Sequence, residues 1–188
     1  MRLFVALLPP PSVRQALLAT MGGVPDARWQ ADGQLHLTLA FIGEVDRHQA
    51  QDIGSALATV DVGAFTADLG GFGSFESGRG RVQALWIAAG PEPLMSSLAA
   101  SVSRALLGAG VPLPTRRFVP HITLARFPAR GVPPTAIARF LAHQPPPALS
   151  WPVEAFHLVE SRLGGGGAHY EPLAAFPLRG SFADRHPR

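Results

Sequence analysis

His36-Leu37-Thr38-Leu39-Ala40 and His121-Ile122-Thr123-Leu124-Ala125 are two versions of one pentapeptide. Side chains alternate between the two faces of a β-strand, so the His and the Thr of each pentapeptide share one face. The Leu or Ile between them lies on the other face, where it suits a buried core. Chance alone gives roughly a quarter of one His-x-Thr match in a chain of this composition. Two matches inside one longer pattern therefore indicate a duplicated strand.

The sequence around the two pentapeptides repeats as well. Residues 2–41 have the pattern of an apolar strand, a proline-bearing turn, a long helix and the first pentapeptide, and residues 81–127 follow the same order up to the second. We interpret residues 2–60 and 81–143 as two copies of one supersecondary unit. Residues 150–179 add C-terminal strands, and residues 181–188 form a tail. The predicted fold class is α+β, as a single bilobal domain over residues 1–188. Its two pseudo-symmetric lobes each have an antiparallel sheet with helices on the outer face, and they flank a central cleft.

Periodicity and breaker residues predict the individual elements. The first predicted helix begins at Ser12, which would form a capping box with Gln15, and ends at Gly22. The second begins after Asp46 as N-cap and ends near Thr59. Two more helices are predicted over residues 91–107 and 135–143. Strands are predicted over residues 2–8, 27–30, 35–42, 64–69, 82–88, 118–127, 151–160 and 169–178. The glycine-rich segment 70–80 is predicted to be a loop, and residues 164–167 a hairpin turn.

Composition sets bounds on the class of protein. Hydrophobic residues make up 47% of the 188 residues, which is ample for a buried core, and the absence of cysteine excludes disulfides and thiolate zinc sites. All 16 basic residues are arginine, with a net charge of +3. Arginine binds phosphate through paired hydrogen bonds, so this composition permits a nucleic-acid partner without establishing one. No apolar run approaches the length of a membrane span, and we expect a cytoplasmic monomer.

The shared polar face of the two strands points to acid–base chemistry. Across a cleft it would bring together two imidazoles, His36 and His121, and two hydroxyls, Thr38 and Thr123. An imidazole with a pKa of about 6.5 acts as acid or base near neutral pH, so a pair can hold opposite protonation states. The hydroxyls can donate hydrogen bonds to phosphate oxygens. A strained 2′,3′-cyclic phosphate carries its own leaving group and can be opened without a metal ion, so we expect no metal and no cofactor.

The same residues resemble those of a known family. The paired motifs are similar to those of the two-histidine phosphoesterase superfamily, and more narrowly of the RNA 2′,3′-cyclic phosphodiesterases, also called 2′-5′ RNA ligases. The resemblance extends over segments 2–6, 28–29, 36–43, 118–126 and 167–173. It implies hydrolysis of the cyclic phosphate to a 2′-phosphomonoester, with slow reversal that joins RNA ends through a 2′-5′ bond. It also implies His36 as the acid toward the 3′-oxygen and His121 as the group that activates water. The residues alone do not assign these two roles.

Further substrate contacts are predicted around the motifs. The resemblance implies that Arg126 binds phosphate, although its distance of five positions from His121 places it on the opposite strand face unless the strand bulges. Phe41, at the equivalent place in the first motif, either stacks on a base or packs in the core. Arg117 is a candidate for a backbone-phosphate contact, and Arg28 a weaker one. Tyr170 is interpreted as structural.

Three functions fit this pattern. The first is hydrolysis of RNA ends that carry a 2′,3′-cyclic phosphate, tRNA fragments among them. The second keeps the site but takes a small cyclic nucleotide as substrate. The third is a non-catalytic RNA- or nucleotide-binding module of the same fold, which the presence of both His and both Thr disfavours.

Overall fold

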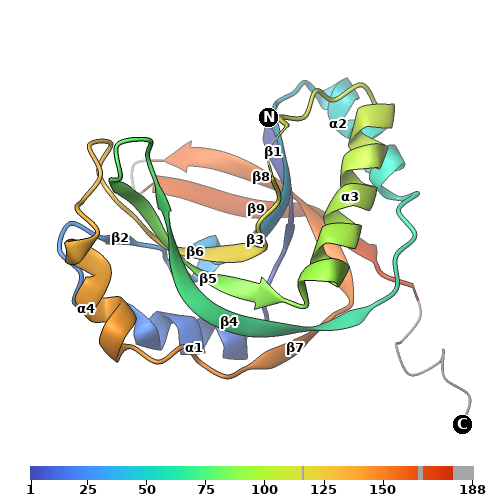
Figure 1. Ribbon diagram of the computed structural model, residues 1–188. Coiled ribbons are helices and arrows are strands. Elements are labelled where there is room, and N and C mark those ends of the chain that lie inside the picture. Colours follow the sequence, from blue (N-terminus) through green and yellow to red (C-terminus); the bar gives the residue numbers. More distant parts are fainter. Residues whose placement is uncertain (116, 165–166, 180–188) are drawn as a thin grey trace, which may run out of the picture.

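One curled antiparallel sheet forms the centre of the molecule, and four α-helices pack on it (Figure 1). The computed structural model describes residues 1–115, 117–164 and 167–179. The strands are β1 Arg2–Leu7, β2 Arg28–Trp29, β3 Leu37–Glu44, β4 Phe65–Glu76, β5 Val82–Gly90, β6 His121–Arg126, β7 Ser150–Val153, β8 Ala155–Gly164 and β9 Gly167–Pro177. The helices are α1 Pro11–Thr20, α2 Arg47–Leu57, α3 Glu92–Gly108 and α4 Thr135–His143, with a short 3₁₀ turn, η1, at Asp32–Gln34.

The strand order corrects the expectation of two separate sheets. The order is β7-β4-β5-β6-β3-β1-β8-β9, with β2 paired to β6, so the two halves join where β6 meets β3. The pairing there is short: Leu37 lies opposite Ile122, and both side chains are fully buried. This single pair is enough to make the strands of both halves one continuous sheet. The predicted α+β class is confirmed, as one curled antiparallel sheet with four helices.

The two faces of the sheet have different chemistry. Leu3, Val5 and Leu7 of β1 point to the main core, where they meet the buried faces of three helices. Those helices contribute Val13 and Leu17 from α1, Ile53 and Leu57 from α2, and Leu98 and Val102 from α3. A second cluster lies under α4, with Ile137 and Phe140 against Val82, Leu85 and Phe127. We call the opposite face, which carries the four motif residues, the histidine face.

Most of the predicted helices are confirmed, with one change in capping. Asp46 accepts a hydrogen bond from the backbone N–H of Gln49 and caps α2, as predicted. The capping box from Ser12 is wrong, because α1 begins one residue earlier, at Pro11, without a side-chain cap. Proline at a first helical position has no N–H that needs a partner, so the helix can begin without that cap.

The largest error in the predicted elements concerns the glycine-rich segment 70–80. Strand β4 continues through it as far as Glu76, where a loop was expected. Gly73 lies opposite Trp86 of β5, and a Cβ atom at this position would overlap the indole ring. The glycine therefore leaves room for a neighbouring side chain and does not break the strand.

The C-terminal strands also differ from the prediction. Segment 151–160, predicted as one strand, is divided at Glu154 into β7 and β8, which pair with β4 and β1 in opposite halves of the sheet. Gly164 and Gly167 pair at the end of the β8–β9 hairpin. Residues 165–166 of the predicted turn and the predicted tail 181–188 lie outside the described residues.

Candidate active site

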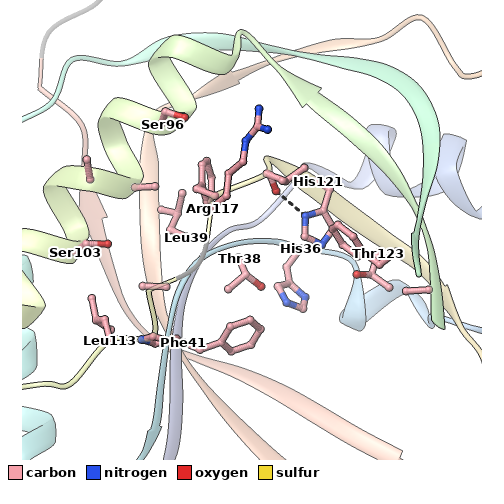
Figure 2. A pocket seen from close by; sticks show the side chains of 18 of the residues that line it. His36, Thr38, Leu39, Phe41, Ser96, Ser103, Leu113, Arg117, His121 and Thr123 are labelled. Carbon is pink, nitrogen blue, oxygen red and sulfur yellow. Dashed lines mark hydrogen bonds between the residues drawn. The ribbon is translucent and has the colours of Figure 1, made fainter. Parts of the chain in front are cut away.

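A cavity of about 670 Å³ opens on the histidine face. It is lined by His36, which immediately precedes β3, by Thr38 and Phe41 from β3, by His121, Thr123 and Arg126 from β6, and by Arg117 from the loop before β6. Arg28, the weaker candidate for a phosphate contact, is not among the lining residues. Figure 2 shows the four motif side chains on one side of the cavity and Ser96 and Ser103 of α3 across from them. The structure thus brings the two motifs to one space.

The junction of β3 and β6 sets how the motif residues face each other. Leu37 pairs with Ile122 in an antiparallel register. One residue further in each direction, this register puts His36 across from Thr123 and Thr38 across from His121. Each imidazole therefore has the other strand's hydroxyl as its cross-strand neighbour, and the four groups form a crossed quartet.

Matching β-bulges answer the strand-face problem raised by Arg126. On β6, Thr123 pairs with Trp86 and Ala125 with Leu85, so Leu124 is an extra residue against β5. A bulge of this kind shifts the alternation of side chains by one position. Arg126 consequently lies on the histidine face and in the cavity lining.

The first motif has the same bulge at the same place. On β3, Thr38 pairs with Ala6 and Ala40 with Val5, so Leu39 is the extra residue. Phe41 therefore also lies on the histidine face, where its side chain is 61% exposed. This position excludes the core alternative for Phe41 and makes it the pseudo-symmetric counterpart of Arg126.

Backbone carbonyls hold both imidazoles in the same tautomer. The Nδ1 atom of His36 lies 2.7 Å from the carbonyl oxygen of Gln34, and that of His121 lies 2.7 Å from the carbonyl oxygen of Val119. A carbonyl only accepts hydrogen bonds, so each Nδ1 carries a proton and donates it. The proton that each histidine gains or loses is therefore on Nε2.

Burial and charge lower the pKa of both histidines. Burial, together with the smaller effects of the charges of Arg126 and His121, lowers the pKa of His36 to about 4, and the hydrogen bond to the Gln34 carbonyl opposes these effects. Burial and the charge of Arg126 likewise lower the pKa of His121, against the Val119 carbonyl. Both imidazoles are thus neutral at pH 7 in the unliganded site, each with a free Nε2 lone pair.

Aromatic side chains enclose each imidazole, and the sequence analysis did not predict these contacts. The ring of His36 lies 4.9 Å from that of Phe4 and 5.0 Å from that of Tyr170. The ring of His121 lies 4.7 Å from that of Phe75 and 5.9 Å from that of Trp86. These contacts explain the burial that lowers both pKa values. Tyr170 retains the structural role predicted for it, but as direct packing against a motif histidine.

The far wall of the cavity was also missed by sequence reasoning. It consists of Ser96, Ala99, Ala100 and Ser103 of α3, with Leu113, Pro114 and Phe118 from the segment that follows. Their spacing on α3 fits one helical face, but small residues on a helix give no signal of a ligand. This part of the cavity is apolar apart from two hydroxyls, and it is large enough for a ring system.

Among residues 1–115, 117–164 and 167–179, no three His, Cys, Asp or Glu side chains come together as a metal-binding group. Within the same residues, no helix combines the length and hydropathy needed to cross a bilayer.

Comparison with known proteins places this architecture in a family. The model of the 2′-5′ RNA ligase superfamily matches residues 9–165. An RNA 2′,3′-cyclic phosphodiesterase of Thermus thermophilus is 38% identical over 195 residues, which cover 96% of this chain and 91% of the relative. The enzyme of the same name from Escherichia coli is 30% identical, over 94% of this chain and 96% of the relative.

Solved structures agree with the sequence matches. A crystal structure of a Thermus thermophilus protein superimposes with a TM-score of 0.77 at 32% identity, covering 96% of this chain and 99% of the other. Escherichia coli LigT in complex with 3′-AMP superimposes with a TM-score of 0.76 at 28% identity, covering 94% and 97%. The chain with the paired His-x-Thr strands therefore belongs to the 2′-5′ RNA ligase superfamily.

Proposed function

We propose that this protein hydrolyses RNA ends that carry a 2′,3′-cyclic phosphate, by acid–base catalysis with His36 and His121. One observation carries the proposal: two imidazoles of the same tautomer, each with its Nδ1 held by a backbone carbonyl, line one cavity together with two threonine hydroxyls. The names of the Thermus thermophilus and Escherichia coli relatives agree with this activity.

The proposed reaction divides the two proton transfers between the histidines. Nε2 of His121 accepts a proton from water as the water oxygen bonds to phosphorus. Nε2 of His36 donates a proton to the 3′-oxygen as the bond from phosphorus to that oxygen breaks, which leaves a 2′-phosphomonoester. When an RNA 5′-hydroxyl takes the place of water as the nucleophile, the same two proton transfers break the bond to the 3′-oxygen and form a 2′-5′ phosphodiester bond. Each proton transfer typically contributes about 10²–10⁴-fold to the rate.

The lowered pKa of His36 sets a condition on this division of roles. At neutral pH the unliganded imidazole has lost the proton that it must donate. A bound phosphate is an anion, and an anion beside an imidazole favours its protonated form. The negative charge of the bound substrate therefore favours protonation of His36, and the carbonyl of Gln34 stabilises the resulting imidazolium.

Phosphate and nucleoside occupy different parts of the cavity in this proposal. The hydroxyls of Thr38 and Thr123 and the guanidinium of Arg126 bind the non-bridging oxygens, where negative charge increases during the reaction. Phe41 is exposed beside them and stacks on the terminal base. Arg117 contacts the sugar-phosphate backbone, and the apolar α3 wall closes the nucleoside part.

Histidine substitutions test the proposal. We expect His36→Ala and His121→Ala each to lower kcat on an RNA 2′,3′-cyclic phosphate by at least about 10²-fold. Far-UV circular dichroism checks that each variant is folded, and ³¹P NMR identifies the 2′-phosphomonoester product. His48→Ala is the matched control, because His48 is highly exposed on α2, outside the cavity. Near-normal turnover in either motif variant would refute the assignment.

The same assay separates the alternative functions. A rate on a nucleoside 2′,3′-cyclic phosphate that equals the rate on an oligoribonucleotide end would favour a small cyclic nucleotide as substrate. Tight binding of both ligands without turnover at any pH from 5 to 9 would favour a non-catalytic binding module.

A further inference from the structure

Two arginines lie directly opposite each other at the end of the histidine face. Arg28 of β2 pairs with Arg126 of β6, next to the pair of Trp29 with Ala125. Directly opposed residues of antiparallel strands project to the same face of the sheet. Trp29 and Ala125 pack into the core, so the register places Arg28 on the histidine face together with Arg126. Arg126 lines the cavity, whereas Arg28 lies outside that lining.

In the unliganded protein, the positive charges of Arg28 and Arg126 repel each other. Like charges directly opposite each other on neighbouring strands repel. Among the described residues, neither guanidinium forms an ion pair with a carboxylate. Asp26, two residues before Arg28, pairs instead with Arg130 at 3.7 Å. Within the part of the chain that the structure describes, the Arg28 side chain makes one hydrogen bond, a long one from Nη2 to the carbonyl oxygen of Phe127 at 3.4 Å. An anion between the two guanidiniums would turn the repulsion into attraction.

We propose that Arg28 binds the internucleotide phosphate that precedes the terminal nucleotide, while Arg126 binds the cyclic phosphate. The inference rests on the proposed function and deepens it, because it makes an oligoribonucleotide end the preferred substrate over a mononucleotide. Two arginines on adjacent strands can bind successive phosphates of one chain, and the flexible side chains accommodate the spacing between phosphates.

The positions of β2 and α3 give the bound strand a direction. In Figure 1, β2 and α3 lie on opposite sides of the β6–β3 junction. Phe41 and the α3 wall take the terminal base on one side. The 5′ continuation of the RNA then leaves across β6 and β2 on the other side, over Arg126 and Arg28.

The test compares a mononucleotide with two dinucleotides that differ only in the charge of the internucleotide linkage. They are adenosine 2′,3′-cyclic phosphate, the dinucleotide ApA with a terminal 2′,3′-cyclic phosphate, and the same dinucleotide with a neutral methylphosphonate linkage. For Arg28→Gln we expect KM on the normal dinucleotide to rise about tenfold, as for the loss of a charge-assisted hydrogen bond. KM on the mononucleotide and on the methylphosphonate should change less than twofold, and Arg28→Lys should recover part of the loss. Arg104→Gln is the control, because Arg104 is exposed on α3 outside the cavity lining.

Each result decides a separate question. An equal loss by Arg28→Gln on all three substrates, or no loss on any, overturns the proposal for Arg28 while leaving the proposed function intact. Absence of turnover by the wild type on every substrate removes the proposed function instead. In that case, fluorescence anisotropy with a labelled oligoribonucleotide ending in a 2′-phosphate still tests Arg28. Arg28→Gln should weaken this binding and reduce the slope of log affinity against log salt by about 0.7, the value for one phosphate contact on a single strand. An unchanged slope refutes the contact.

Discussion

At the scale of single residues, the two histidines share a motif but sit in different surroundings. Phe4 and Tyr170 enclose His36, whereas Phe75 and Trp86 enclose His121, and Phe75 is partly exposed. The stronger burial of His36 lowers its pKa to about 4, below the ordinary value of an imidazole. The pKa of His121 is also lowered, mainly by burial. Both lowered pKa values favour the uncharged imidazole at pH 7 in the unliganded site.

These pKa shifts predict where the pH–rate profile lies. The profile of kcat/KM reports the free enzyme: the base must be neutral, and the acid must carry its proton. Because both pKa values are lowered, the acid loses its proton at a lower pH than an ordinary imidazole would. We expect the maximum of kcat/KM below pH 6.5, with a decline through neutral pH. Initial rates in buffers from pH 4 to 9 measure it, and a maximum above pH 7 contradicts the prediction.

Substitution of Arg126 should shift the pH dependence of kcat/KM. Its positive charge lowers the pKa of both histidines, so Arg126→Gln should raise both pKa values and shift the alkaline limb of kcat/KM to higher pH. The same change removes a phosphate contact and should raise KM by about tenfold or more. Arg47→Gln on the exposed surface of α2 is the charge-matched control and should leave the limb in place. If KM rises but the alkaline limb of the kcat/KM profile stays at the same pH, Arg126 binds phosphate without influencing the pKa values of the histidines.

At the scale of elements, the sequence predicts the two strands that bring the motif residues to the cavity, but not the bulges in those strands. The identity of the motif strands follows from His-x-Thr alternation, and the helices from apolar periodicity. Nothing in the pentapeptides marks Leu39 or Leu124 as the extra residue of a bulge, because a bulge is defined by the partner strand. Only the pairings with β1 and β5 show why Phe41 and Arg126 face the cavity.

Strand β4 illustrates the same limit and yields a stability prediction. The glycine content of segment 70–80 predicts a loop that includes Gly73. In the structure, Gly73 lies in a strand, and its missing side chain leaves room for the indole of Trp86 on the next strand. We expect Gly73→Ala to lower the free energy of unfolding by about 1–3 kcal/mol, because an added methyl group overpacks this contact. Urea unfolding measures the loss, and near-UV circular dichroism reports the displaced Trp86 ring.

A neighbouring glycine serves as the control for that prediction. A Cβ atom at Gly71 on the same strand would have no heavy atom within 4 Å. Gly71→Ala should therefore be neutral, or stabilising by up to about 1 kcal/mol through the lower entropy of the unfolded chain. If the two substitutions change the free energy of unfolding equally, the contact between Gly73 and Trp86 does not explain why glycine occurs in this strand.

At the scale of the whole molecule, the two motif segments lie in one sheet and face one cavity. The repeat in the sequence predicts two related halves, but whether their sheets join depends on the contact between β3 and β6. That contact is a single pair of apolar residues, Leu37 and Ile122, which a pattern within either strand cannot reveal. The same pair fixes the register of the crossed quartet, so folding and site assembly depend on one junction.

This dependence predicts coupling between the two junction residues. Leu37 and Ile122 are fully buried, so Leu37→Ala and Ile122→Ala should each cost about 2–5 kcal/mol. The double variant should lose about 0.5–3 kcal/mol less than the sum of the single variants, because either substitution already removes the shared contact. Leu37→Ala combined with Ile137→Ala, which lies in the separate cluster under α4, should instead be additive within about 0.5 kcal/mol.

The junction also predicts that the halves unfold together. Trp29, Trp86 and Trp151 lie on β2, β5 and β7, all in the half of the sheet that contains β6. Tryptophan fluorescence therefore reports on one half, whereas far-UV circular dichroism reports on both. Because the main core runs continuously from β1 through β3 and β6 to α3, we expect the two urea transitions of the wild type to coincide. A fluorescence transition separate from the dichroism transition would show that the halves are independent, and the cavity between them would then depend on their docking rather than on one cooperative fold.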